Sequence, residues 1–161
     1  MPQVFSTDRI AYLVGLDKWR VIKFATGKEY EIQPAYGQAS GQGTRRLYSL
    51  DNAYEIALAV RLLETGFRSK VIGKILRQLR QSGLVGKQLR GARKYLAVFR
   101  TPMTGAPLKK KRLQSVELVA SMDEATKVAK GRPEDDMIVV PVGPLVSEIE
   151  ERLATLESGE R

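Results

Sequence analysis

The sequence predicts an α+β protein, with four short helices and a β-hairpin in its first half and a small α/β domain ending in a helix in its second half. In the first half, apolar residues recur at helical spacing on either side of a glycine-rich stretch. In the second half, short runs of Val, Leu and Ile alternate with segments of helical pattern. Gly83 and Gly86 interrupt the helical pattern between the halves, so we expect domains at residues 1–85 and 86–161.

The first two predicted helices are short and separated by a tight turn. Ser6 or Thr7 can cap a helix that ends at Gly15, and Asp17 can cap a second helix from Lys18 to about Ala25. Two short helices around a glycine-containing turn are typical of a helix-turn-helix, whose second helix enters the major groove of DNA. Many helix pairs that never contact DNA share this pattern.

The hairpin is expected after the second helix. Tyr30–Gln33 can form a strand that ends at Pro34, and glycines at 37, 41 and 43 follow before Arg45 and Arg46. Two arginines beside a pliable tip suit contact with phosphates or a narrow minor groove, as in the wing of a winged helix-turn-helix. The alternative is an ordinary solvated loop.

Two longer helices complete the first half. Ser49 is expected to cap Leu50–Glu64, Gly66 to end that helix, Phe67 to pack back on it, and Ser69 to cap the fourth helix. The core positions of the fourth helix are Val71, Ile72, Ile75, Leu76 and Leu79. Its outer face carries Lys70, Lys74, Arg77 and Arg80. These cations either extend a phosphate-binding surface or form an ordinary solvated face.

The sequence of the second half predicts three strands and two helices. The strands are expected at Lys94–Phe99, Ser115–Ala120 and Met137–Val140, and the helices at Asp123–Ala129 and about Leu145–Leu156. The connection 101–112 ends in the basic run Lys109–Arg112, which is either an exposed loop or a second contact with a polyanion.

The order of these elements over about residues 4 to 80 resembles the DNA-binding module of the MerR family. The residues that carry the resemblance are Phe5-Ser6-Thr7, Ile10-Ala11, Leu13, Gly15-Leu16, Arg45-Arg46-Leu47-Tyr48-Ser49, Ile56, Arg61-Leu62-Leu63, Gly66-Phe67 and Ile72. The resemblance implies a bacterial transcription regulator that binds double-stranded DNA, with RNA polymerase as a further candidate partner. It also implies that the hydroxyls of Thr7 and Tyr48 hold phosphates.

The expected DNA contacts lie on the second helix, at the wing and at the first helix start: Thr7, Lys18, Trp19, Arg20, Lys23, Arg45, Arg46 and Tyr48. Trp19 has two interpretations. It either packs in the core or under the wing, or it lies along the sugar edge of the DNA.

The last helix carries an apolar stripe of Leu145, Ile149, Leu153 and Leu156. The stripe could cover the small sheet or pair with a second copy, and we expect a homodimer because helix-turn-helix regulators commonly read two half-sites.

Charge is distributed unevenly along the chain. Residues 1–100 hold 18 Lys and Arg against 7 Asp and Glu, a net charge of +11, whereas residues 101–161 have a net charge of −2. A basic first half favours a polyanionic partner for that half.

The composition excludes several classes of protein. The absence of cysteine and histidine removes disulfides, thiolate chemistry, Cys/His zinc sites and a mercury-type sensor. No signal peptide or transmembrane stretch is visible, so we expect a cytoplasmic, nucleoid-associated protein. We expect it to have no membrane partner and no cofactor.

Two other functions stay open. An architectural or chromosome-segregation protein would use the same fold to coat DNA with little sequence preference. An enzyme in the second half would draw on its carboxylates, which include Glu117, Asp123, Glu124 and Glu134–Asp136. These residues form no evident pair beside a glycine-rich phosphate loop, so we expect no catalysis.

Overall fold

The computed structural model describes residues 3–36, 45–85, 89, 91, 94–103, 111–133 and 135–159. These residues form a mixed α+β structure with six helices and two small antiparallel sheets. The helices are α1 (Thr7–Val14), α2 (Lys18–Thr26), α3 (Leu50–Glu64), α4 (Ser69–Gln81), α5 (Met122–Lys130) and α6 (Gly143–Ser158). The strands are β1 (Phe5–Ser6), β2 (Leu47–Tyr48), β3 (Tyr95–Pro102), β4 (Lys111–Val119) and β5 (Asp136–Pro141).

The caps of the first helices are those that the sequence predicts. The side chain of Ser6 accepts a hydrogen bond from the backbone N–H of Arg9, and Asp17 accepts one from Arg20 at 2.9 Å. Gly15 ends α1 in the left-handed conformation, at φ 67°. Local chemistry therefore sets the turn between α1 and α2.

The third helix begins as predicted, and the fourth does not. Ser49 and Asn52 form a reciprocal capping box at the start of α3. The predicted cap of α4 is wrong, because Arg68 occupies the cap position and Ser69 is the first helical residue. The hydroxyl of Ser69 instead donates to the carboxylate of Glu29.

The predicted strand Tyr30–Gln33 is also wrong. Residues 28–30 form a turn, and Glu31 has a φ of 57°, which takes the chain out of the extended conformation. Asn52 of α3 then holds the segment by donating to the carbonyl of Gln33 and accepting from the N–H of Ala35, both at 3.0 Å. A side chain, and not a neighbouring strand, thus satisfies these two backbone groups.

The segment before α3 pairs with the start of the chain. Strand β2 lies antiparallel to β1, with Phe5 opposite Tyr48 and Ser6 opposite Leu47. The N–H of Tyr36 donates to the carbonyl of Leu47 at 3.0 Å, so the two segments that flank residues 37–44 come together at their base. The glycines expected at the tip of a wing lie outside the described residues.

The second sheet has the order β4-β3-β5, with β3 in the centre and both pairs antiparallel. The helix expected at Asp123–Ala129 is present as α5, with Ser121 as its cap, and the three expected strands are present but longer. Lys111 and Arg112 begin β4 rather than ending a loop, and Lys109 and Lys110 lie outside the described residues.

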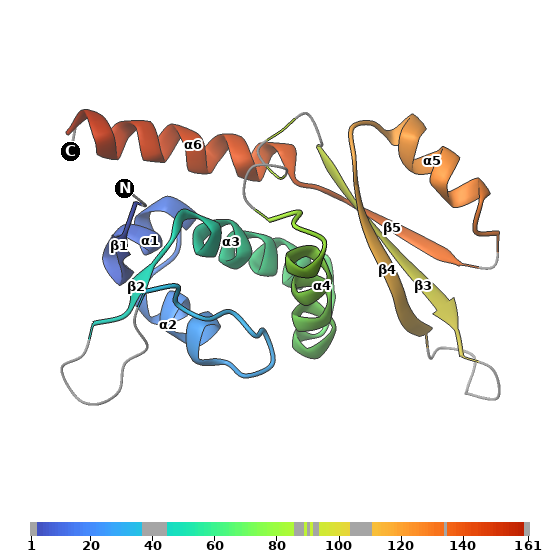
Figure 1. The fold of residues 1–161 in the computed structure, drawn as a ribbon, viewed down its shortest axis with the longest axis horizontal. Coiled ribbons are helices and arrows are strands. Elements are labelled where there is room, and N and C mark those ends of the chain that lie inside the picture. The colour runs from blue at the N-terminus through green and yellow to red at the C-terminus, as the bar shows by residue number, and fades with distance from the viewer. Residues whose placement is uncertain are drawn as a thin grey trace.

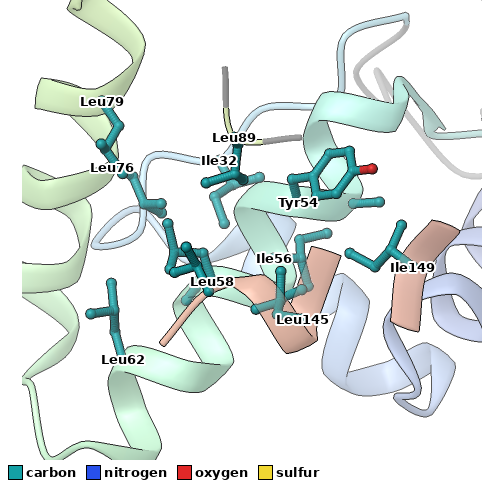
Figure 2. Close-up of a cluster of buried hydrophobic side chains, with 14 of the residues drawn as sticks. Ile32, Tyr54, Ile56, Leu58, Leu62, Leu76, Leu79, Leu89, Leu145 and Ile149 are labelled. Atoms are coloured by element: carbon teal, nitrogen blue, oxygen red, sulfur yellow. The ribbon is translucent and has the colours of Figure 1, made fainter. Parts of the chain in front are cut away.

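The two halves of the chain share one core. Leu96 and Val98 of β3 face the helices of the first half, whereas α5 packs against the opposite face of the sheet (Figure 1). Helix α4 lies between α3 and this sheet, and α6 runs back along α1 and α3 (Figure 1). The buried side chains of α3, α4 and α6 meet in one cluster, as Figure 2 shows.

The apolar stripe of α6 packs mainly within the chain. Leu145 and Ile149 are buried beside α3 (Figure 2), while Leu153 and Leu156 are half-buried against the same core. The stripe therefore covers the helices of the first half, which is neither of the two placements expected from sequence. Dimerisation stays a prediction, and Leu145 and Ile149 are not available for it.

Candidate nucleic-acid interface

Helix α2 presents a basic and aromatic face to solvent. Its buried side is formed by Val21 and Phe24, and the ring of Phe24 contacts that of Tyr30 with centroids 4.7 Å apart. Because these residues occupy the inner face, Trp19 and Lys23, one helical turn apart, are both exposed. Trp19 is 76% exposed, so it does not pack in the core.

A groove of about 480 Å³ joins this helix to the segment before β2. It is lined by the start of α1, by Lys18 and Ile22 of α2, and by Arg45 and Arg46. Lys18 and Ile22 are four residues apart and therefore share one face of the helix. The groove brings together Thr7, Lys18, Arg45 and Arg46, four of the residues that the sequence predicts to contact DNA.

The groove carries a net positive charge. Its lining contains three cationic side chains and one carboxylate, that of Asp8. Asp8 forms an ion pair with Lys18 at 3.3 Å, and both side chains are more than half exposed. An exposed pair of this kind contributes little to stability, so Lys18 can exchange Asp8 for a phosphate at small cost.

Tyr48, two residues after Arg46, anchors the strand that follows the groove. Tyr48 is fully buried, and burial raises the pKa of its hydroxyl above the ordinary value of 10.0, against smaller opposing effects of Thr7 and Arg46. The ring of Tyr48 fixes β2 beside β1 and the start of α1. In this conformation its hydroxyl is not accessible to a phosphate at the surface.

Arg20 lies apart from the groove. It lines a separate cleft of about 240 Å³, between the α1–α2 turn, α3 and α6. This cleft also contains Arg61 and Arg152, together with the carboxylates of Glu64 and Glu148. The structure therefore groups Lys18 with the two arginines and separates Arg20 from them.

A second hollow lies on the other side of Arg46. It has a volume of about 570 Å³ and is lined by the end of α2, residues 31–34, Arg46 and Arg80. Arg80 was expected on the outer face of α4, but its Nε donates to the carboxylate of Glu55 at 2.7 Å. Arg77 is likewise paired with Glu31, with Nε and Oε2 2.8 Å apart.

Glu55 is a buried charged residue behind this hollow that the sequence interpretation did not single out. It is only 5% exposed, and it contacts Asn52 as well as Arg80. Burial raises the pKa of its carboxyl above 4.5, with a further increase from Asp51, while Arg80 and Asn52 act in the opposite direction. A glutamate inside the apolar stripe Ala53–Ala57 was the available signal for such a buried network.

The sequence matches no model of a known protein family, and no curated protein matches it. The MerR resemblance therefore stays a prediction. Within the described segments, no helix is both long enough and apolar enough to cross a membrane. In the same part of the chain, no three Asp, Glu, His or Cys side chains are grouped so that they could hold a metal ion.

Proposed function

We propose that the protein is a sequence-specific DNA-binding transcription regulator of the winged helix-turn-helix type. The observation that carries the proposal is the groove in which Lys18, Arg45 and Arg46 converge beside the exposed face of α2. Residues distant in sequence come together there, next to an exposed tryptophan and Lys23. Converging cations beside an exposed helix are what phosphate contact and groove entry require.

Each residue has a role in this proposal. Helix α2 enters the major groove with Trp19 and Lys23, whose exposed side chains reach base edges or sugars. Lys18, Arg45 and Arg46 contact phosphates or the adjacent minor groove, and Thr7 adds a hydroxyl donor at the start of α1. A homodimer through the accessible part of α6 would present two such units to two half-sites.

A non-specific DNA-coating protein is the second candidate. The observation that favours it is a further basic hollow formed by Lys28, Lys70 and Lys74 around the Glu31–Arg77 pair. Cations spread over a wide surface favour phosphate binding without base readout. The ratio of affinities for a selected site and for random duplex separates the two candidates, since a regulator prefers its site by about a thousandfold or more.

The test is the salt dependence of duplex binding, measured by fluorescence anisotropy for the wild type and for K18A/R46A. We expect the variant to bind random duplex more weakly and to have a logarithmic salt slope smaller by about two, since each lost phosphate contact reduces the slope by about one. K127A/K130A removes the same charge from exposed positions on α5 and is the matched control. If the two variants bind alike, the groove is not the binding surface.

A further inference from the structure

A cleft separate from the basic groove lies where the two halves of the chain meet. It has a volume of about 520 Å³ and is bounded by the α3–α4 turn on one side and by the ends of β3 and β4 on the other. Figure 1 shows that α4 lies between α3 and this sheet. The volume falls within the range of pockets that hold small molecules.

Part of the lining of the cleft is apolar. Phe67 is 8% exposed, and Val71 and Leu113 are half-buried. Met103, which follows the last residue of β3, is exposed at the rim. These apolar side chains suit the hydrocarbon part of a ligand and not the phosphate backbone of a nucleic acid.

Both sides of the cleft also carry cationic side chains. Arg68, Arg100 and Lys111 all line the cleft. Asp136 is shared by two of them, with the carboxylate 3.8 Å from Nη2 of Arg100 and in direct contact with Lys111. Among the side chains that the structure describes here, three cations share one carboxylate, which leaves an excess of positive charge.

The guanidinium group of Arg100 is only partly engaged by Asp136. Its Nε is buried and has no hydrogen-bond partner in the described part of the chain. The side chain as a whole is 31% exposed, so its other guanidinium N–H groups can donate to an anionic oxygen in the cleft.

We propose that this cleft binds a small organic anion with an apolar body, such as an aromatic carboxylate. The carboxylate pairs with Arg100 and Lys111, near Arg68, while the body of the ligand lies on Phe67, Val71 and Leu113. Because the ligand would contact both α4 and the sheet, it would stabilise their packing. This proposal does not depend on DNA binding, because it can be measured on the protein alone.

The experiment titrates the protein with the fluorescent aromatic sulfonate 8-anilinonaphthalene-1-sulfonate and then competes it with benzoate. The wild type should bind one probe molecule, and R68Q/K111Q should bind it about tenfold more weakly, as expected for the loss of charge-assisted contacts. K127Q/K130Q removes the same charge from α5 and should bind like the wild type. Circular dichroism checks that both variants stay folded.

Two results would overturn the proposal. One is equal probe affinity for R68Q/K111Q and K127Q/K130Q. The other is displacement of the probe by inorganic phosphate as effectively as by benzoate at equal ionic strength, which would mean that the cleft is a simple anion patch. Displacement by benzoate alone, lost in R68Q/K111Q, supports it.

Discussion

At the scale of single residues, the clearest constraint is the close approach of the chain to α4 at Gly73. A Cβ at this position would lie 1.9 Å from the carbonyl oxygen of Glu29, a backbone atom that cannot rotate away. The segment after α2 thus rests directly on α4. This contact fixes one edge of the hollow beside Arg46.

Gly73→Ala should therefore destabilise the protein. Alanine gains about 1 kcal/mol of helix propensity over glycine, but overpacking of this kind typically costs about 1–3 kcal/mol and displaces the segment. We expect a net loss in the free energy of unfolding, measured by urea denaturation. Gly131→Ala is the control, since the nearest atom to its Cβ would be 3.4 Å away. A Gly73→Ala variant as stable as this control would contradict the close approach.

The burial of Glu55 should make the stability of the protein depend on pH. Its pKa is raised in the folded state, chiefly by burial, so the folded protein binds this proton more tightly than the unfolded chain does. The resulting contribution to stability is complete below the unfolded pKa and is lost as the pH rises through the folded pKa. The free energy of unfolding of the wild type minus that of E55Q should therefore fall as the pH rises above the ordinary carboxyl pKa of 4.5. A difference that rises over this range would contradict the direction of the shift.

At the scale of elements, the packing of α6 on the first half is the feature that most changes the interpretation of the sequence. Beside the buried stripe, Nη1 of Arg152 donates to the carbonyl of Leu13 at 3.1 Å, and its guanidinium lies over Gly15. A cation at the end of α1 also complements the helix dipole there. Helix α6 therefore supports the helix pair that carries the candidate interface.

Ile149→Ala tests this packing. Ile149 is 1% exposed within a single chain, so its truncation should lower the free energy of unfolding by about 2–4 kcal/mol. The loss should not depend on protein concentration. Leu156→Ala, at a half-buried position, should cost less. A loss that appears only at concentrations where a dimer forms would place Ile149 between two chains instead.

Features set by neighbouring residues could be predicted from the sequence, whereas features set by distant residues could not. The caps at Asp17 and Ser49 involve partners three residues away, and both are present as predicted. The segment after α2 depends on Asn52, 19 residues from Gln33, so its strand-like composition was misleading. The contact of Arg152 with Leu13 spans 139 residues, which no local pattern could indicate. The same holds for the site: Lys18 and Arg46 could be named, but the separation of Arg20 and the burial of Tyr48 could not.

At the scale of the whole molecule, the two predicted domains are joined by a continuous core. The inner face of the second sheet and the buried half of α6 both pack on the helices of the first half. A fragment of residues 1–85 would expose the surfaces that Leu145 and Ile149 cover. We expect this fragment to unfold at a lower urea concentration than the full chain, as followed by circular dichroism, because it buries less apolar area. Equal midpoints would show that the first half folds independently.

The excess positive charge of the molecule lies in its first half, where the groove and the exposed face of α2 are found. The measurement that tests the central claim most directly is selection of genomic DNA fragments at about 150 mM salt, since affinity has meaning only at a stated salt concentration. The wild type and R45A/R46A are compared. We predict that the wild type recovers one sequence motif and that the variant loses it. Recovery of unrelated fragments would indicate a non-specific DNA-coating protein, and recovery of no DNA at all would contradict DNA binding.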